Sequence, residues 1–382
     1  MKKTLLTICL VWMCFSLSAQ KIIDLSGKWS FSIDRQDNGE KEKWFSHTLN
    51  DFINLPGSMP EKLKGDEVTA KTQWTGSLYD SSYYYNPYME KYRKEGNIKF
   101  PFFLTPDKHY VGAAWYQKEV NIPADWKGER ILLFLERPHI ETTVWVNGQK
   151  TGMQNSLCVP HQYDITRYVR PGKCTITIRV DNRIKEINVG PDSHSITDQT
   201  QGNWNGIVGR ICLQTTPKTY FDDIQIYPEP EQKLARVKVV IKGTGTAKVK
   251  LSAESFNTDK KHIVPAIQQE IKLNKGVTET EMVLPMGNDM LLWDEFHPAL
   301  YKLKAEVTNG KKTEIKEIQF GMRRFEIKGK WFYVNGRKTQ LRGTVENCDF
   351  PLTGYAPMDV ESWERVFRIC RSYGLNHMRF HS

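Results

Sequence analysis

Short stretches of alternating hydrophobic and polar residues run through most of the chain, separated by turn residues. A period of two predicts strands that each bury one face. In the first half of the chain the clearest stretches are residues 29–33, 114–120, 130–135, 142–146 and 174–180. No amphipathic helical stretch alternates with them, as βαβ units would require. We therefore predict a mainly β protein whose first domain, residues 20–218, is a β-sandwich of jelly-roll type.

A second series of alternating stretches fills residues 219–322. An immunoglobulin-like sandwich has roughly 100 residues and about seven short strands, which matches this segment. Two Asn-Gly pairs, Asn147-Gly148 and Asn335-Gly336, each follow one predicted strand and precede another. Asn and Gly tolerate positive φ at both central positions of a two-residue turn, so each pair predicts a tight hairpin.

The pattern changes after residue 321. Residues 339–345 and 376–380 are typical of strands, and the segment between them contains a predicted helix. Asp359 can cap the start of this helix, and Gly374 can take the left-handed conformation at its end. Apolar residues share one helical face: Trp363, Val366, Phe367 and Cys370. Strand, helix and strand in this order predict a βαβ unit with parallel strands.

A single βαβ unit cannot cover both faces of a parallel sheet. A complete (β/α)8 barrel takes roughly 250 residues, whereas only residues 323–382 are present here. We therefore expect these residues either to be the first βαβ of an incomplete (β/α)8 barrel, or to pack as an appendage onto the sandwiches.

The first 19 residues differ from the rest of the chain. Lys2 and Lys3 precede an apolar run at 5–15, and small residues lead up to Ala19. This order is typical of a secretory signal peptide cleaved after Ala19, so we predict a secreted or periplasmic protein. The apolar run is too short to cross a membrane, and no later stretch approaches the roughly 20 apolar residues of a membrane span.

Composition and charge exclude several classes of protein. With 39% hydrophobic and 26% charged residues, the chain is neither disordered nor collagen-like. The formal net charge is +10, but basic residues alternate with acids instead of forming a stripe, so we expect no nucleic-acid binding. The cysteines show no C-x-x-C pair and no metal-site spacing. A disulfide between Cys158 and Cys174 is permitted in an exported protein, although buried free thiols are the favoured interpretation.

Several short motifs together carry a family resemblance. They contain recurrent Trp, Asn-Gly and Arg-Gly elements in a fixed order along essentially the whole mature chain. They lie at residues 112–120, 144–148, 204–213, 292–301, 321–323, 333–336, 341–343 and 376–379. In this order they resemble the landmarks of glycoside hydrolase family 2, which contains β-galactosidases, β-glucuronidases and β-mannosidases. The resemblance implies a jelly-roll sugar-binding domain, an immunoglobulin-like sandwich and a catalytic (β/α)8 barrel, in agreement with the patterns above.

The resemblance also implies a reaction, the retaining hydrolysis of terminal β-linked sugars in oligo- or polysaccharides. One glutamate protonates the leaving oxygen and another attacks the anomeric carbon, with the carboxyls roughly 5–5.5 Å apart. The family carries both glutamates on later barrel strands, which places them beyond Ser382, so we expect this chain alone to be inactive. β-Galactosidase activity is the default expectation, and no cofactor or metal is expected.

Candidate substrate-binding residues follow from the same resemblance. Arg379 corresponds to an arginine beside the nucleophile, although a structural ion pair at the barrel rim is the alternative. His381 is expected to contact the sugar. Glu346 and Asp349 follow the first barrel strand, on the face where barrel active sites are built, and could touch substrate.

Two further candidates lie in the first domain. Asp198 precedes Trp204 in a polar loop, where some family members extend an acidic residue into the sugar subsite. Domain packing is the alternative role for Trp204. The tyrosine-rich stretch from Tyr79 to Tyr110 could stack on sugar rings, although packing against a neighbouring domain is favoured.

Two other classes of function remain open. The two sandwiches could form a non-catalytic carbohydrate-binding or interaction protein. A metal-dependent enzyme built on His377 and His381 is the weakest hypothesis, because the sequence offers no third ligand nearby.

Overall fold

The computed structural model describes residues 21–76, 81–100, 106–185, 193–198, 202–347, 350 and 353–381. The predicted signal peptide, Tyr79, Cys348 and Asp349 lie outside these residues. The chain forms two compact units. The first contains Lys21–Thr216 with Ile327–Tyr333 and Arg337–Ser382, and the second contains Pro217–Glu326 with Val334–Gly336. Both units are built mainly of strands, as predicted.

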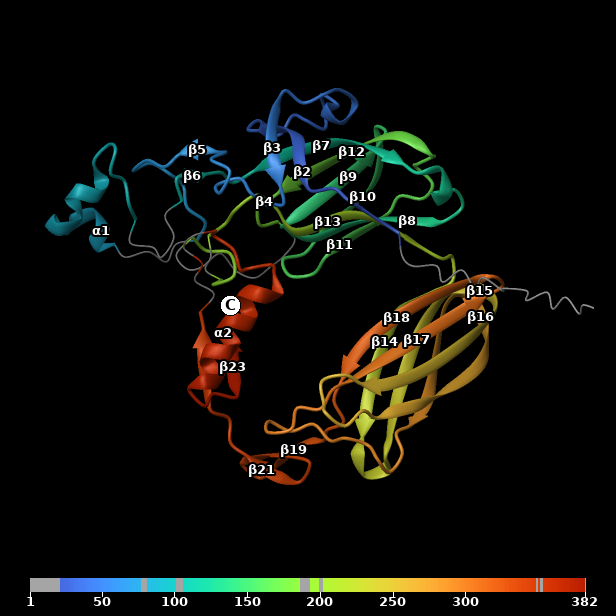
Figure 1. The fold of residues 1–382 in the computed structure, drawn as a ribbon. Helices are drawn as coiled ribbons and strands as arrows, with labels where there is room; N and C mark the ends of the chain where they lie inside the picture. Colours follow the sequence, from blue (N-terminus) through green and yellow to red (C-terminus); the bar gives the residue numbers. More distant parts are fainter. Residues whose placement is uncertain are drawn as a thin grey trace, which may run out of the picture. The chain divides into compact units, whose positions relative to one another are not determined.

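The first unit contains two antiparallel sheets (Figure 1). One has the order β10-β9-β12-β7-β2-β3, and the other has the order β1-β13-β8-β11 with β4 attached to β13. The strands of the first sheet are β2 (Gly27–Asp34), β3 (Asp51–Leu55), β7 (Ala113–Ile122), β9 (Glu141–Val146), β10 (Gln149–Asn155) and β12 (Gly172–Asp181). Those of the second are β1 (Ile22–Asp24), β4 (Gly57–Ser58), β8 (Arg130–His139), β11 (His161–Asp164) and β13 (Gly206–Thr216).

Alternate residues of both sheets meet in one hydrophobic core. Leu133 and Leu135 on β8 are fully buried, and they share this core with Ile176 and Ile178 on β12 of the other sheet. The period of two in the sequence is the cause, because successive side chains of a strand point to opposite faces. Asn147 between β9 and β10 has a φ of 50°, so the predicted Asn-Gly hairpin is confirmed.

The outer face of the six-stranded sheet is also covered. A short 3-10 helix, η1 (Trp44–Ser46), lies over it. The Phe45 ring stacks on Trp145 at 5.1 Å, and Trp145 contacts Trp115 at 5.0 Å. Beside these rings the buried Arg179 pairs with Asp181 at 3.0 Å. This sheet is therefore buried on both faces over its centre.

A long insertion interrupts the first sandwich between two short paired strands, β5 (Asp66–Glu67) and β6 (Lys108–His109). It contains the helical turns α1 (Ser82–Tyr85) and η2 (Pro87–Arg93). Another turn, η3 (Ala124–Trp126), follows β7. The insertion holds much of the tyrosine-rich stretch singled out in the sequence.

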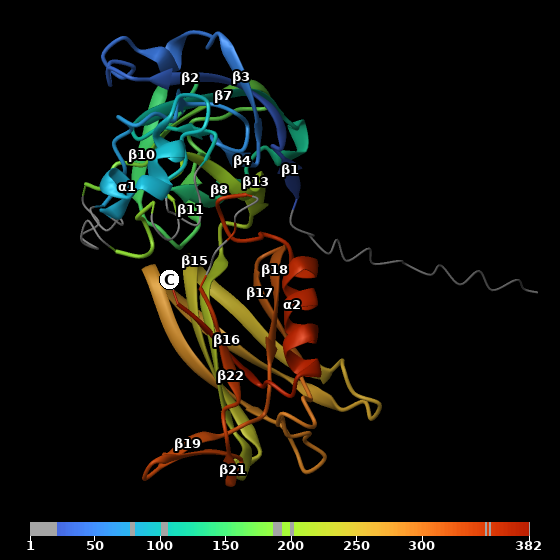
Figure 2. The same cartoon turned by 90° about the vertical axis from the view of Figure 1, so that its left-hand side faces the viewer.

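The second unit is a sheet with the order β14-β15-β17-β18, in which β16 also pairs with β15. Its elements are β14 (Tyr220–Glu229), η4 (Pro230–Gln232), β15 (Leu234–Ser255), β16 (Ile263–Pro285), β17 (Tyr301–Asn309) and β18 (Lys312–Phe320). The alternating stretches at 236–241 and 247–251 both lie in the single strand β15. Gly245, with a φ of 83°, allows a bulge there, so the strand bends and continues instead of turning back. Both views show β15 and β16 as long curved strands (Figures 1 and 2).

The last part of the chain begins with a small sheet of β19 (Phe325–Lys328), β20 (Trp331–Val334) and β21 (Arg337–Thr339). It continues with β22 (Gly343–Glu346), α2 (Val360–Ser372) and β23 (His377–Phe380). Strands β22 and β23 pair in parallel. The predicted βαβ unit is therefore confirmed.

The residues predicted to begin and end α2 have the expected contacts and conformation. The Asp359 carboxylate accepts a hydrogen bond from the Ser362 backbone N–H at 2.8 Å, and Gly374 has a φ of 77°. On the apolar face, the Trp363 ring contacts Phe380 of β23 at 5.3 Å and Phe367 at 5.9 Å. These contacts hold the helix against the strand pair.

Candidate functional site

Three of the predicted site residues lie at the same edge of the β22–β23 pair. Glu346 is the last residue of β22 and stands opposite Phe380 on β23. Arg379 is on β23, and His381 follows that strand. The His381 backbone N–H donates to the Glu346 carbonyl oxygen at 2.9 Å. Because ligand sites of parallel α/β folds form at the carboxyl ends of the strands, this edge is the candidate site.

A residue from the sandwich part of the same unit reaches this edge. The His194 and His381 rings lie 5.1 Å apart between centroids, and their Nδ1 atoms are 3.4 Å apart. Both side chains are exposed. The loop that contains His194 and the end of β23 therefore meet at one polar, solvent-accessible point.

Trp204, another predicted site residue, is buried, with 5% of its surface exposed. Its ring stacks on His139 at 4.5 Å, with 19° between the planes. The Trp204 carbonyl oxygen is 2.7 Å from His139 Nδ1, and because a carbonyl only accepts, this nitrogen is assigned the proton. Burial lowers the pKa of His139 to about 4, against the opposing effect of that hydrogen bond. His139 is thus neutral, and it holds Trp204 through one ring contact and one hydrogen bond.

Tyr355 connects Trp204 to the loop after β22. The Trp204 and Tyr355 rings lie 5.5 Å apart, and the Tyr355 hydroxyl donates to Glu61 Oε2 at 2.9 Å. Burial raises the pKa of Tyr355, and the adjacent Glu61 raises it further. Burial also opposes ionisation of Glu61, but hydrogen bonds from Lys62 and Tyr355 outweigh it and lower the pKa of that carboxyl. The pair is therefore a neutral phenol donating to a carboxylate.

Asp198 is buried. Its side chain is 3% exposed, and Oδ2 lies 3.7 Å from His109 Nε2. The two carboxylate oxygens accept backbone N–H groups, from Thr75 at 2.6 Å and from Asn203 at 3.0 Å. These contacts tie the segment just before Trp204 to the chain at Thr75. They favour a supporting role for Asp198, while its direct contact with a sugar stays a prediction.

Metal-ligating and thiol residues are dispersed. Over the described ranges of the chain, no group of three or more His, Cys, Asp or Glu side chains could hold a metal ion.

Cys158 and Cys174 are free thiols, so the permitted disulfide does not form. Cys174 is buried as expected, and burial raises its pKa to about 11. Cys158 is exposed, which corrects the expectation of a buried thiol there: it lies in the turn between β10 and β11, outside the core.

Sequence reasoning missed the partners of the predicted residues. His194 contacts His381, His139 and Tyr355 contact Trp204, and Glu61 accepts from Tyr355, but none of these four partners belongs to a short motif. Each comes from a different segment, and only long-range packing brings them together. A polar residue next to a buried tryptophan, as at His139 and Trp204, gives no local signal in the sequence.

Taken together, the two compact units and the parallel strand pair define a mainly β protein, and one loop of its β-sandwich meets the candidate site at the carboxyl ends of that pair. A family profile described as "Glycosyl hydrolases family 2, sugar binding domain" matches residues 22–217. A second, described as "Glycosyl hydrolases family 2", matches residues 219–323. The chain belongs to glycoside hydrolase family 2, and the predicted membership is confirmed.

Curated relatives carry two kinds of name. The chain is 24% identical over 355 residues to a β-glucuronidase of Paenibacillus borealis, covering 88% of this chain and 51% of that protein. It is 24% identical over 301 residues to a β-galactosidase of Thermoanaerobacter pseudethanolicus, covering 74% and 38%. With human β-glucuronidase it shares 23% over 394 residues, covering 93% and 53%. The chain thus spans about half the length of the curated relatives it matches, or less.

Solved structures show the same fold. The β-glucuronidase of Ruminococcus gnavus in complex with D-glucuronic acid matches with a TM-score of 0.67 at 18% identity. That match covers 94% of this chain and 56% of the other. The apo structure of the same enzyme gives a TM-score of 0.66 at 19% identity. Along the part of the chain that the structure describes, none of the helices is both long and apolar enough to cross a membrane.

Proposed function

We propose that this chain is the amino-terminal part of a retaining exo-β-glycosidase that removes terminal β-linked sugars from oligo- or polysaccharides. Its family membership and relatives named β-glucuronidase and β-galactosidase support this proposal. The observation that carries it is the gathering of Glu346, Arg379 and His381 at the carboxyl ends of β22 and β23. β-Galactosides are the first substrates to test, with β-glucuronides beside them.

The domain assignment is part of the proposal. We assign residues 20–218 to a jelly-roll sugar-binding domain, 219–322 to an immunoglobulin-like sandwich and 323–382 to the start of a (β/α)8 barrel. The two-sheet sandwich and the parallel β22–β23 pair support this order. Residues 1–19 would direct the protein out of the cytoplasm as a cleaved signal peptide.

In this proposal Arg379 positions the nucleophile. A guanidinium at the end of β23 would hold a neighbouring carboxylate ionised and oriented through two parallel hydrogen bonds. His381 and the adjacent His194 would bind sugar hydroxyls at the rim. Trp204, held by His139 and Tyr355, would close one side of the subsite with an apolar ring face.

The two catalytic glutamates would come from chain beyond Ser382. Retaining hydrolysis needs carboxyls on both sides of the scissile bond, roughly 5–5.5 Å apart. Of the described acids after residue 323, Glu346 is the one that ends a barrel-type strand, while Asp359, Glu361 and Glu364 belong to α2 or its cap. One strand end cannot supply both carboxyls.

The test begins with the intact mass of the polypeptide from its source. Two sandwiches and a complete barrel predict a mass above roughly 70 kDa. That polypeptide should hydrolyse a p-nitrophenyl β-galactoside or β-glucuronide with retention at the anomeric carbon, whereas the 382-residue chain should not. A native mass near that of the short chain, with saccharide binding and no hydrolysis, would favour a non-catalytic carbohydrate-binding protein instead.

A further inference from the structure

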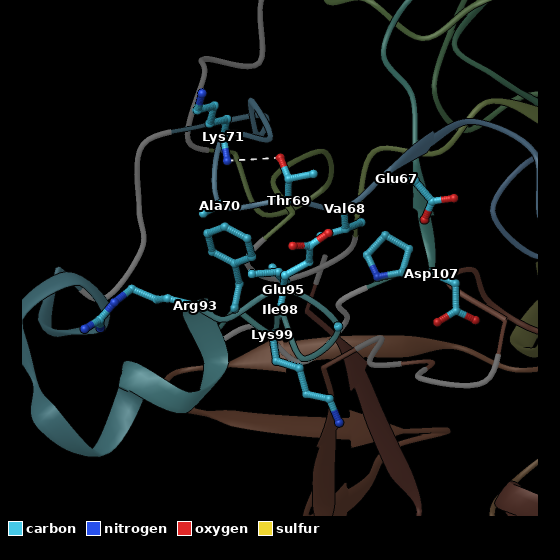
Figure 3. Close-up of a pocket in the computed structure, with 13 residues that line it drawn as sticks. Glu67, Val68, Thr69, Ala70, Lys71, Arg93, Glu95, Ile98, Lys99 and Asp107 are labelled. Carbon is cyan, nitrogen blue, oxygen red and sulfur yellow. Dashed lines mark hydrogen bonds between the residues drawn. The ribbon is translucent and has the colours of Figure 1, made fainter.

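The insertion between β5 and β6 lines a half-open cavity of about 900 Å³ (Figure 3). Small-molecule sites in proteins span roughly 300–1,000 Å³, so the volume suits a ligand of several rings. The lining comes from the insertion and from Glu67 of β5, and none of the predicted site residues belongs to it. The lining residues include Val68, Lys71, Glu95, Lys99, Phe100 and Asp107.

The charges around this cavity balance. Glu67, Glu95 and Asp107 line it together with Lys71, Arg93 and Lys99. Two of these charges already have partners, because Glu67 pairs with Lys108 outside the cavity and Arg93 donates to the Tyr83 carbonyl oxygen. A wall with equal numbers of acids and bases does not select an ion of either sign.

The remaining polar groups suit hydroxyls. Among the residues that the structure describes, the Glu95 and Asp107 carboxylates make no hydrogen bond or ion pair. Figure 3 shows Glu95 in the middle of the cavity beside Val68, whereas Lys99 extends away. A carboxylate accepts strongly from O–H donors. Phe100, Val68 and Pro106 provide apolar wall between these acceptors.

Contacting aromatic rings connect Phe100 in the cavity wall to the exposed Tyr84. The Phe100 ring stacks on the buried Tyr83 at 4.7 Å, and Tyr83 contacts Tyr84 edge-to-face at 5.1 Å. Tyr84, Tyr85 and Tyr88 are 50%, 73% and 84% exposed. Rings with an apolar face and a polar tip are typical of sites where one side of the ligand is apolar and the other is wet.

We propose that this insertion is an accessory binding site for a neutral oligosaccharide. Sugar C–H faces stack on the exposed tyrosine rings, and sugar hydroxyls donate to Glu95 and Asp107 inside the cavity. A neutral ligand with many hydroxyl groups fits this cavity, because its wall has equal numbers of acidic and basic residues, two carboxylate acceptors and apolar patches. The assignment rests on the insertion alone and does not depend on glycosidase activity.

The test uses the 382-residue chain and oligosaccharides of known charge. Isothermal titration with β-1,4-galactotetraose, cellotetraose and laminaritetraose should give saturable binding to at least one of them, and tetragalacturonic acid should bind more weakly. Tyr88→Ala and Glu95→Gln should each weaken binding, by about 2- to 12-fold for the loss of one polar contact. Both side chains are exposed, so neither change disturbs a core.

Tyr373→Ala is the matched control, because Tyr373 is 81% exposed at the end of α2, outside the insertion. It should bind like the parent chain. Heat from none of the neutral probes would overturn the proposal, as would tighter binding of the acidic probe or full binding by both insertion variants. Binding that survives these variants but is lost in Arg379→Ala would also overturn it, while leaving the glycosidase proposal intact.

Discussion

The Asp181 carboxylate should be the most stabilising charged group of the first sandwich. It is fully buried at the end of β12, and it accepts hydrogen bonds from Arg179 at 3.0 Å and from the Arg183 guanidinium at 2.6 Å. Lys185 lies 2.7 Å away. Burial opposes ionisation, but the bonds from Arg183 and Lys185 outweigh it and hold the pKa of Asp181 well below its ordinary 3.8.

Asp181→Asn removes the charge and keeps the shape. The Arg179 guanidinium, whose side chain is 7% exposed, then loses one of the carboxylates that offset its buried charge. Breaking a buried ion pair costs about 3–5 kcal/mol. We expect the low end of that range, since the amide oxygen still accepts one hydrogen bond. For a unit of this size, about 3 kcal/mol corresponds to a fall in Tm of roughly 6–12 °C. Asp125→Asn is the control, because its pair with Lys21 is 64% exposed on the acid side and should not shift Tm measurably.

The pH dependence gives a second, independent readout. A carboxyl with a lowered folded pKa contributes its stability above the unfolded pKa and loses it as pH falls towards the folded value. The difference in Tm between parent and Asp181→Asn should therefore be constant from about pH 5 to 8 and shrink below about pH 4. Circular dichroism melts across this range measure it. An unchanged Tm at neutral pH, or a difference that widens in acid, would refute this reasoning.

Three further predictions concern the candidate site and the thiols. Tyr355→Phe removes the hydroxyl that donates to Glu61 and should destabilise the loop after β22 by about 1 kcal/mol, seen as faster limited proteolysis there; unchanged cleavage would contradict it. In the longer native enzyme, Arg379→Ala should lower kcat by about 10²-fold, or about 2.7 kcal/mol, with partial recovery in Arg379→Lys, whereas full activity would remove Arg379 from the site. Cys158 should react with an aromatic disulfide reagent in the folded chain while the buried Cys174 reacts only after denaturation, and equal rates would disprove the assigned burial.

Local signals predicted the local structure. The Asn147-Gly148 hairpin and the α2 cap at Asp359 each depend on residues within a few positions of one another, and both form as expected. The bulge at Gly245 has no such local signal, because a glycine between two alternating stretches is equally compatible with a turn and with a bend in one strand. Only the pairing of β15 with its neighbours decides between them.

Individual residues of the candidate site were predicted from the sequence, but the residues that contact them were not. Arg379 and His381 could be named from the family resemblance, which places them at the end of a predicted strand. The contact of His381 with His194, and the support of Trp204 by His139, join segments far apart in the sequence. Such contacts follow from how the sheets close, and alternation along a strand contains no information about them.

The pairing of β1 with β13 has a consequence for the order of folding during synthesis. Ile22 pairs with Gln214, so the second sheet of the first unit cannot be completed until nearly all of its sandwich, Lys21–Thr216, has left the ribosome. In the second unit most neighbouring strands are consecutive in the chain, as with β15 and β16. Contacts close in sequence form sooner than distant ones. The second unit should therefore fold quickly once its residues emerge, while closure of the first remains the slow, chaperone-sensitive step.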